Sequence, residues 1–446
     1  MSLKILMPDS VSYIIKTLYA HGYEAYAVGG CVRDAILGRE AHDWDITTSA
    51  KPQEVKALFR RTIDTGLQHG TVTVMIDHTG YEVTTYRIDG EYEDARHPKE
   101  VIFTGDLLED LKRRDFTINA MAYNDQSGLV DAFDGVGDLE RGIIRCVGAP
   151  HDRFSEDALR MLRAVRFAAQ LGFSIEPDTR AAIADLAPTI AKVSAERIAS
   201  ELLKLLTSAH PMELRTAWET GLTAVFLPEF DRMMETPQHN KHHCYSVGEH
   251  TLHALEGTDR DKVLRLAMLL HDIAKPQTKT TDEEGWDHFY GHPEAGEKEA
   301  VKILRRLKLD NDTIRRVAAL VRWHDDRPVV TERNVRWAIN RIGEEQFPAL
   351  FAVKRADIGA QSAYQRQEKL EYVAAYEACY LDILVKKQCI SKKDLALNGK
   401  DLIAAGIRPG KEMGMILDSL FGSVLDDPSL NEREVLMELV KKQWLT

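Results

Sequence analysis

Residues 26–48, YAVGGCVRDAILGREAHDWDITT, contain the two features from which we interpret the rest of the chain. Gly29 and Gly30 stand between an apolar run and a helical pattern, where paired glycines let backbone N–H groups approach an anion closely. Arg33 follows within the predicted helix, and its guanidinium is suited to binding phosphate. We therefore expect a strand over residues 25–29, a phosphate-binding turn, and a helix over residues 31–38.

Two carboxylates follow about ten residues later. Asp43 and Asp45 occupy positions i and i+2 of a strand that we expect over residues 43–48, so their side chains point to the same face. Two carboxylates on one face repel each other unless a cation lies between them, and divalent cations prefer oxygen ligands. Either feature alone is more often a plain turn or an exposed acidic pair. Together, a phosphate-binding turn and metal-binding acids are what nucleotidyl transfer requires.

The motif GGCVRD at residues 29–34, followed by DWD at residues 43–45, resembles the head motif of class II tRNA CCA-adding enzymes and bacterial poly(A) polymerases. The resemblance implies an α+β fold, in which a small mixed β-sheet nucleotidyltransferase head precedes an all-α neck, an HD-like body and a tail. It also implies that Asp43 and Asp45 are catalytic and bind Mg²⁺, and that Gly30 and Arg33 contact phosphates. The expected domains are a head at 1–150, a neck with a base-recognition helix at 151–215, a body at 216–360 and a tRNA-binding tail at 361–446.

Other head elements follow from local patterns. Residues 9–21 and 52–60 predict helices, and the alternating segments 70–76 and 81–86 predict a hairpin around residues 77–80. Glu82 would place a third carboxylate on this sheet, either at the metal site or facing solvent. Residues 87–112 are polar and resemble the mobile loop that CCA-adding enzymes keep.

The segment KRRDFT at residues 112–117 resembles the RRDFT motif of the same family. The resemblance places Arg114 on the triphosphate or ribose side of the nucleotide. The alternative is that Arg114 forms a helix-capping ion pair with Asp115.

Residues 154–173 predict one amphipathic helix with a stripe of charges at every third position. For an arbitrary helix such a stripe is usually solvated, but EDALR at residues 156–160 resembles the family's EDxxR motif. Cytosine and adenine each present an amino donor beside a ring acceptor, whereas guanine and uracil present the inverse. Asp157 accepts and Arg160 donates, so the pair matches C and A alone. We expect Arg163 and Arg166 to surround the base. SAERI at residues 194–198 resembles the SxERI motif, which we interpret as neck scaffolding.

Histidine becomes frequent after residue 240, and HDIAKP at residues 271–276 resembles the HD phosphohydrolase superfamily. The resemblance implies a second divalent metal on His250, His271, Asp272 and Asp357. His292 and His324 could hold phosphate or a further metal. The alternative is an HD fold without metal that serves as a tRNA-binding body.

The remaining sequence predicts a long helix at 365–388 and a tail of short helices, in which Lys400, Arg408, Gly410 and Lys411 are candidate phosphate contacts. The net charge of −12 requires that RNA be bound through local basic patches. Five scattered cysteines without a CxxC pair suggest reduced thiols. With no signal peptide and no apolar run of about 20 residues, we expect a cytoplasmic protein without a membrane span.

The resemblance implies transfer of two CMP units and then AMP from CTP and ATP to the 3′ end of tRNA, with release of pyrophosphate. An A-only-adding enzyme or a poly(A) polymerase would share the head and neck, but the loop at 87–112 and the absence of a strongly basic tail favour CCA addition. From another class, the HD-like region could be a metal-dependent phosphohydrolase and the principal activity. A non-catalytic RNA-binding module is disfavoured by the intact pair Asp43 and Asp45.

Overall fold

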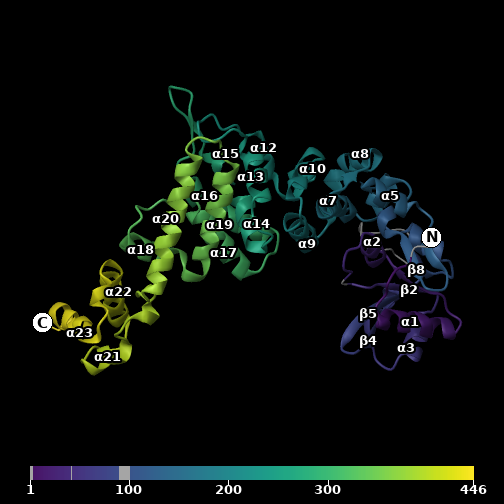
Figure 1. Ribbon diagram of the computed structural model, residues 1–446, viewed down its shortest axis with the longest axis horizontal. Helices are drawn as coiled ribbons and strands as arrows, with labels where there is room; N and C mark the ends of the chain where they lie inside the picture. Colours follow the sequence, from purple (N-terminus) through teal and green to yellow (C-terminus); the bar gives the residue numbers. More distant parts are fainter. Residues whose placement is uncertain (1–3, 42, 90–100, 446) are drawn as a thin grey trace. The chain divides into compact units, whose positions relative to one another are not determined.

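The computed structural model of the protein describes residues 4–41, 43–89 and 101–445. The chain divides into two compact units, Met1–Asp231 and Arg232–Thr446, and the boundary lies within α12 (Pro228–Glu235). In Figure 1 the first unit runs from purple to teal and contains all of the large sheet, whereas the second unit is helical apart from one small hairpin. The predicted α+β fold with a small mixed sheet is confirmed.

The head is built on a seven-stranded sheet in the order β3-β4-β5-β2-β1-β8-β9. The sheet is mixed because β2 and β5 pair in parallel, while the neighbouring pairs are antiparallel. The strands are β1 (Ala25–Val28), β2 (Ile46–Thr48), β3 (Thr62–Gly66), β4 (Thr71–Ile76), β5 (Thr79–Thr85), β8 (Met121–Asn124) and β9 (Gly128–Asp131). A separate antiparallel pair, β6 (Arg87–Asp89) and β7 (Val101–Phe103), frames the expected loop, whose central residues 90–100 lie outside the described chain.

The strand that we expected over residues 43–48 begins only at Ile46, so the expectation is wrong in its first half. Trp44 explains the difference. Its indole is buried just before the strand, and its Nε1 donates a hydrogen bond to the Ala41 carbonyl at 3.1 Å. The backbone of Asp45 still meets the sheet, because the Val28 N–H donates to the Asp45 carbonyl at 3.0 Å.

Short helices cover the sheet. In α1 (Asp9–Ala20) the buried residues Val11, Ile14, Ile15 and Leu18 recur at helical spacing and form the face that packs on β1. The other head helices are α2 (Gly30–Ile36), α3 (Pro52–Leu58), α4 (Leu107–Lys112), the 3₁₀ turn η2 (Thr117–Asn119) and α5 (Gly135–Arg141).

The predicted neck helix over residues 154–173 is two helices, so that expectation is wrong. Asp157 has extended backbone angles, φ −142° and ψ 104°, which end α6 (Pro150–Glu156) before α7 (Leu159–Leu171) begins. The Asp157 Oδ1 then accepts the Leu159 N–H at 3.0 Å, as a capping residue does. The rest of the neck contains α8 (Pro177–Leu186), α9 (Ala195–Leu206), α10 (Leu214–Glu219), α11 (Thr223–Phe226) and the small parallel pair β10 (Ile143–Ile144) and β11 (Ser174–Ile175).

The helices of the second unit pack around buried histidine and aromatic side chains. The long helix that we predicted is α20 (Arg366–Val385). Its other elements are α13 (Val247–Glu256), α14 (Lys262–Leu270), α15 (Lys275–Thr278), β12 (Thr280–Thr281), β13 (Asp287–His288), α16 (His292–Arg306), α17 (Asn311–Trp323), α18 (Glu332–Ile342), α19 (Phe347–Ala360), α21 (Gly399–Ala404), α22 (Lys411–Asp426) and α23 (Arg433–Trp444). The last three helices enclose a separate apolar cluster that includes Leu402, Leu420 and Leu436. Within the described residues, no helix combines the length and apolarity needed to cross a membrane.

The β4–β5 hairpin allows a test of the head fold. It closes with a two-residue turn, because Ile76 pairs with Thr79, and both turn residues are left-handed, Asp77 at φ 44° and His78 at φ 67°. This conformation favours glycine. We expect His78→Gly to raise the free energy of unfolding by about 0.5 kcal/mol, because relief of the left-handed backbone exceeds the loss of chain entropy.

Urea denaturation of the full chain measures this change, and Thr79→Gly in the adjoining strand is the control. That control should destabilise the protein by about 0.5–1 kcal/mol. A His78→Gly variant no more stable than the parent would contradict the turn geometry.

Candidate active site

The predicted acids Asp43 and Asp45 lie just before β2, and a third carboxylate lies near them. Asp45 and Glu82 directly precede Ile46 and Val83, which are partners in the parallel pairing of β2 with β5. Although Asp45 is exposed, neighbouring groups partly desolvate its carboxylate and so raise its pKa; Arg114 lowers the pKa, and Glu82 and Asp43 raise it further. Glu82 and Asp43 therefore lie close enough to Asp45 for their charges to act on it.

These three acids are more widely spaced than a preformed metal cage. Among the described residues, the groups of three ligand atoms that lie within 4.8 Å of one another are both in the second unit. Asp43, Asp45 and Glu82 are exposed to solvent, so a hydrated cation has access to all three. Hard divalent ions that keep part of their water shell suit such an open set of carboxylates.

The glycine turn lies against Arg114. Gly29 has φ 83°, a left-handed conformation that ordinary side chains rarely adopt, and it directly precedes α2. A Cβ at this position would lie 3.0 Å from Arg114 Nη1. The Nε of Arg114 is buried and has no hydrogen-bond partner within the described chain. The turn, the acids and a partly unsatisfied guanidinium therefore lie in one neighbourhood.

Arg114 does not form the ion pair with Asp115 that we considered as its alternative role. Its Nη2 instead lies 3.5 Å from Asp110 Oδ2 in α4. Burial raises the pKa of Asp110, but Arg113 and Arg114 lower it below its usual value.

Arg33 is placed differently from what the sequence suggests. Its side chain is buried, with Nε and Nη2 donating to both oxygens of Asp34 at 2.9 and 3.0 Å. Nη1 donates to Asn119 Oδ1 at 2.6 Å. All three nitrogens of the guanidinium thus have partners inside the head, and its visible role is to tie α2 to η2.

The arginines of α7 each bind carboxylates of the first unit. Arg160 Nη1 donates to Glu156 Oε2 at 2.6 Å, and its Nη2 donates to the Arg113 carbonyl at 3.0 Å. Arg163 Nη2 donates to Asp115 Oδ2 at 2.6 Å. We expected these charges to face solvent or the base. Two of the arginines instead bind the segment that carries Arg114, and so connect α7 to it.

Arg166 is the most buried member of this series. Its Nε donates to Glu201 Oε2 at 2.7 Å, and its guanidinium stacks on Phe167, with Cζ 3.6 Å from the ring centroid. The exposed fractions of the Arg166 and Glu201 side chains are 8% and 6%. Burial lowers the pKa of Arg166 to about 10, although Glu201 opposes the change. This ion pair packs α7 against α9.

Asp157 and Arg160, the predicted base-reading pair, come from the junction of α6 and α7 and from the first turn of α7. The Arg160 N–H donates to the Asp157 carbonyl at 3.0 Å. Asp157 Oδ2 accepts from Arg197 Nη2 at 2.7 Å. The sequence reasoning assigned Arg197 to scaffolding and did not use Glu156; the signal that could have identified both is their place inside the EDALR and SAERI motifs.

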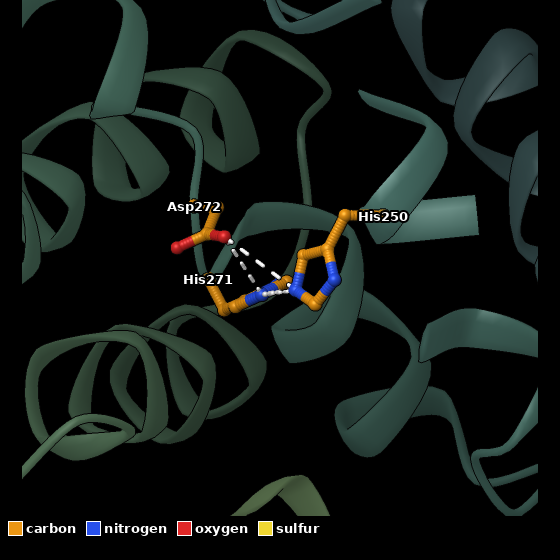
Figure 2. A group of neighbouring side chains, drawn as sticks. All are labelled: His250, His271 and Asp272. Carbon is orange, nitrogen blue, oxygen red and sulfur yellow. Dashed lines mark hydrogen bonds and ion pairs between the residues drawn. The ribbon is translucent and has the colours of Figure 1, made fainter. Parts of the chain in front are cut away.

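The second unit brings the predicted metal ligands together. His250 on α13, the pair His271–Asp272 after α14 and Asp357 on α19 are buried. Figure 2 shows the first three with their side chains directed at one another. His271 Nε2 lies 3.3 Å from His250 Nε2 and 3.2 Å from Asp272 Oδ2. His250 Nε2 lies 2.9 Å from Asp357 Oδ1.

His292 and His324 extend this cluster on the other side of Asp272. Their Nε2 atoms lie 3.4 and 3.7 Å from Asp272 Oδ1 and 3.2 Å from each other. Two groups of three ligands, each with atoms within 4.8 Å, therefore share Asp272. Lys275 Nζ lies 2.7 Å from Asp272 Oδ2 and partly neutralises it. Burial raises the pKa of Asp272, but His271 and Lys275 hold it well below its usual value.

A cavity of about 620 Å³ adjoins the cluster. Its lining combines the ligand side chains with cations and aromatic rings: Asp272, His292, His324, Asp357, Lys241, Lys275, Arg327, Lys369, Trp286, Tyr290 and Tyr364. Imidazole and carboxylate ligands beside several cations are suited to an anionic substrate such as a phosphate ester.

Three family descriptions match successive parts of the chain. Residues 25–145 match the poly A polymerase head domain, and residues 172–234 match the probable RNA and SrmB-binding site of polymerase A. Residues 277–440 match the tRNA nucleotidyltransferase domain 2, described as putative. Together with the mixed sheet, the glycine turn and the neighbouring acids, the first of these matches defines residues 25–145 as a nucleotidyltransferase head.

Relatives that match over nearly the whole chain include several CCA-adding enzymes. The CCA-adding enzyme of Lactiplantibacillus plantarum is 38% identical over 430 residues, covering 96% of this chain and 94% of the relative. That of Enterococcus faecalis is 37% identical over 437 residues, covering 96% and 95%. The crystal structure of Bacillus stearothermophilus CCA-adding enzyme in complex with CTP superposes with a TM-score of 0.75 at 32% identity, covering 98% and 99%. This protein belongs to the CCA-adding enzyme family.

The buried pair of Arg166 and Glu201 provides a test of its structural role. Glu201→Ala leaves a buried guanidinium without its carboxylate, and we expect a loss of about 3–5 kcal/mol in the free energy of unfolding. Replacing both residues, Arg166→Met with Glu201→Leu, should recover most of that loss, because no buried charge remains.

Urea denaturation of the full chain measures both variants. The control is Glu219→Ala, which breaks the exposed pair with Arg180 and should cost less than about 1 kcal/mol. If Glu201→Ala were as mild as this control, Arg166 would not depend on Glu201.

Proposed function

We propose that this protein adds C, C and A to the 3′ end of tRNA, using CTP and ATP and releasing pyrophosphate without a nucleic-acid template. The observation that carries the proposal is the group formed by the left-handed Gly29 turn, Arg114 and the acids Asp43, Asp45 and Glu82. Family membership supports the same reaction, as does the relative of 32% identity whose structure contains CTP. The match to a tRNA nucleotidyltransferase domain supports tRNA as the acceptor.

The acids Asp43 and Asp45 would hold Mg²⁺, with Glu82 as the third carboxylate in reach. When bound, Mg²⁺ supplies charge neutralisation of the triphosphate and activation of the 3′-hydroxyl. The chain's own groups orient the nucleotide: the backbone at Gly29 and Gly30 admits a close approach of phosphate, and Arg114 presents its guanidinium beside them. Arg33 would act indirectly, because its hydrogen bond to Asn119 holds α2 against η2.

Base choice would rest on Asp157 and Arg160, which offer an acceptor beside a donor and so match the Watson–Crick edges of cytosine and adenine. Both belong to the same unit as the acids. Arg160 binds the Arg113 carbonyl, and Arg114, the next residue, is coupled to Asp45. Arg163 and Arg166 would support this pair through Asp115 and Glu201, which are their partners.

Incorporation of each nucleotide separately into two transcripts, one ending before CC and one ending after CC, tests this function. We expect CTP to be used by the first transcript and ATP by the second, each at least about a hundredfold faster than UTP or GTP, because the wrong base leaves polar groups unpaired. Asp45→Ala should lower incorporation at least about a hundredfold.

Asp64→Ala is the control, since Asp64 is an acid of the same sheet that pairs with Lys56 at the surface. Refusal of CTP by the first transcript would indicate an A-only-adding enzyme or a poly(A) polymerase. Equal use of UTP and CTP would remove Asp157 and Arg160 from base choice.

A second candidate function is favoured by the buried cluster in the second unit. We propose that His250, His271, Asp272 and Asp357 bind a divalent metal, and that Asp272, His292 and His324 can bind another. The protein would then hydrolyse phosphate esters bound in the adjoining cavity. Neutral imidazoles and carboxylates on one centre are the ligand set that transition metals prefer. The four histidines also have their Nδ1 atoms bonded to backbone carbonyls, which directs each Nε2 at the centre.

Metal content after chelation, reloading with Mn²⁺ or Ni²⁺ and dialysis tests the cluster directly. We expect metal to be retained by the parent and lost from the Asp272→Ala variant. His253→Ala, on the same helix as His250 but stacked on Tyr245, should retain metal as the parent does. The rate of phosphate release from p-nitrophenyl phosphate should rise and fall with metal content. If the parent protein retained no metal, the proposal would be contradicted and the cluster would have only a structural role.

A further inference from the structure

Three of the cations that line the cavity beside the histidine cluster act on one point: Lys241, Arg327 and Lys369. Burial lowers the pKa of His242, another lining residue, and the charges of these three cations lower it further. Within the described chain, neither lysine forms an ion pair, and Arg327 pairs with Asp325 at 2.8 Å. The cavity therefore holds positive charge that the neighbouring carboxylates do not pair with.

A buried amide fixes one of these cations beside the predicted metal ligands. Gln361 Nε2 donates to both oxygens of Asp357, at 3.1 and 3.0 Å, and Gln361 Oε1 accepts from Lys369 Nζ at 2.6 Å. Gln361 is only 5% exposed, so the packing around it restricts this arrangement. Because the amide is neutral, the ammonium of Lys369 keeps its charge while it lies two hydrogen bonds from Asp357.

The environment of Lys369 favours an anionic ligand. Burial lowers the pKa of Lys369, and the charge of Arg327 lowers it further, although Asp357 opposes the change. Like charges that lie close together in a partly buried site destabilise each other, and an anion between them relieves this repulsion. Lys369 and Arg327 line the cavity, so such an anion can reach them from solvent.

The cluster and the cations together match a ligand with two adjoining anionic groups. One phosphoryl group can lie beside Asp272, His292 and His324, which also line the cavity, and a second can lie at the unpaired cations. A simple phosphate monoester has one phosphoryl group, whereas a diphosphate has two that share one bridging oxygen. Inorganic pyrophosphate is the smallest ligand of this kind, and the proposed nucleotidyl transfer releases it.

We propose that the cavity binds a diphosphate group, supplied by inorganic pyrophosphate, and that the protein hydrolyses it there. Lys369, Arg327 and Lys241 bind the phosphoryl group that lies away from the histidine cluster. Water adds to one phosphorus as the bridging P–O bond breaks, so one pyrophosphate and one water give two orthophosphates, and the protons of the water leave with them. The inference rests on the second proposed function, in which the cluster binds metal and hydrolyses phosphate esters. Hydrolysis would remove the product from which nucleotidyl transfer can run backwards.

Orthophosphate release by the full-length protein, reloaded with Mn²⁺ and dialysed, tests the activity. Asp45→Ala is present in every sample, so that the acids of the head do not bind pyrophosphate. We expect the kcat/KM for pyrophosphate to exceed that for p-nitrophenyl phosphate at least about tenfold, because the second phosphoryl group adds charge-assisted hydrogen bonds. Lys369→Ala should lower the kcat/KM for pyrophosphate at least about tenfold and change that for p-nitrophenyl phosphate much less.

Binding gives a measurement that does not depend on turnover. Calorimetry compares methylenediphosphonate, whose bridging carbon resists hydrolysis, with methylphosphonate, and metal content is measured after each titration. The diphosphonate should bind at least about tenfold more tightly to the parent, and Lys369→Ala should remove most of this difference. Lys369→Arg should keep part of it.

Two further variants complete the comparison. Lys302→Ala is the matched control, because Lys302 lies on the same helix as His292 but pairs with Glu299 at 3.1 Å, and it should behave as the parent does. Lys241 is exposed, so Lys241→Ala carries the comparison if Lys369→Ala does not fold.

This inference and the function on which it rests fail in different ways. A parent that retains no metal contradicts both. A parent that retains metal and hydrolyses p-nitrophenyl phosphate, but neither hydrolyses pyrophosphate nor prefers the diphosphonate, overturns this inference alone. Parental behaviour of both Lys369→Ala and Lys241→Ala would overturn the role of the cations. Faster hydrolysis of ADP or CDP than of pyrophosphate would overturn inorganic pyrophosphate as the source of the diphosphate group.

Discussion

A continuous series of alternating charges and hydrogen bonds joins the glycine turn to the neck, and the arrangement of the first unit depends on it. Arg33 on α2 donates to Asn119, whose Nδ2 donates to Asp115 at 3.1 Å. Asp115 binds Arg163 on α7, and Arg163 Nη1 lies 3.8 Å from Glu201 on α9. Because most of these groups are buried, removing one partner leaves an uncompensated charge, which is costlier than losing a surface pair. The glycine turn and α7 are therefore held as one piece.

This network also determines what the sequence could and could not predict about the site. Local motifs located the acids Asp43 and Asp45, the glycine turn and the EDALR segment, because each lies within a few residues of its own pattern. The residues that bind each arginine could not be located in this way. Arg163 binds a carboxylate 48 residues earlier, and Arg166 binds one 35 residues later. Spacing along one helix carries no information about such distant partners. From the sequence alone, arginines in buried ion pairs could therefore not be distinguished from arginines exposed to solvent.

The fold was predictable to a similar extent. Hydrophobic periodicity gave α1, the β4–β5 hairpin and α20 with bounds that differ by a few residues at most. It failed at Asp43 and at Asp157, where one side chain ends or delays an element: Trp44 turns into the core, and Asp157 caps the next helix. At the first position an apolar side chain enters the core, and at the second a polar side chain bonds to the backbone of the next helix. Both effects depend on a single side chain, so the periodicity of hydrophobic residues alone was insufficient there.

The histidine cluster has a consequence of its own. His271, His292 and His324 each bond Nδ1 to the carbonyl three residues earlier in the chain, those of Met268, Phe289 and Val321. Each of these three rings is therefore oriented by a nearby backbone carbonyl, and their Nε2 atoms converge. Little rotational entropy remains to be lost on coordination, so affinity at this centre would be governed by how well an ion tolerates a rigid, nitrogen-rich cage. Such preorganisation favours soft or borderline ions over strongly hydrated ones, in contrast to the open carboxylates of the head.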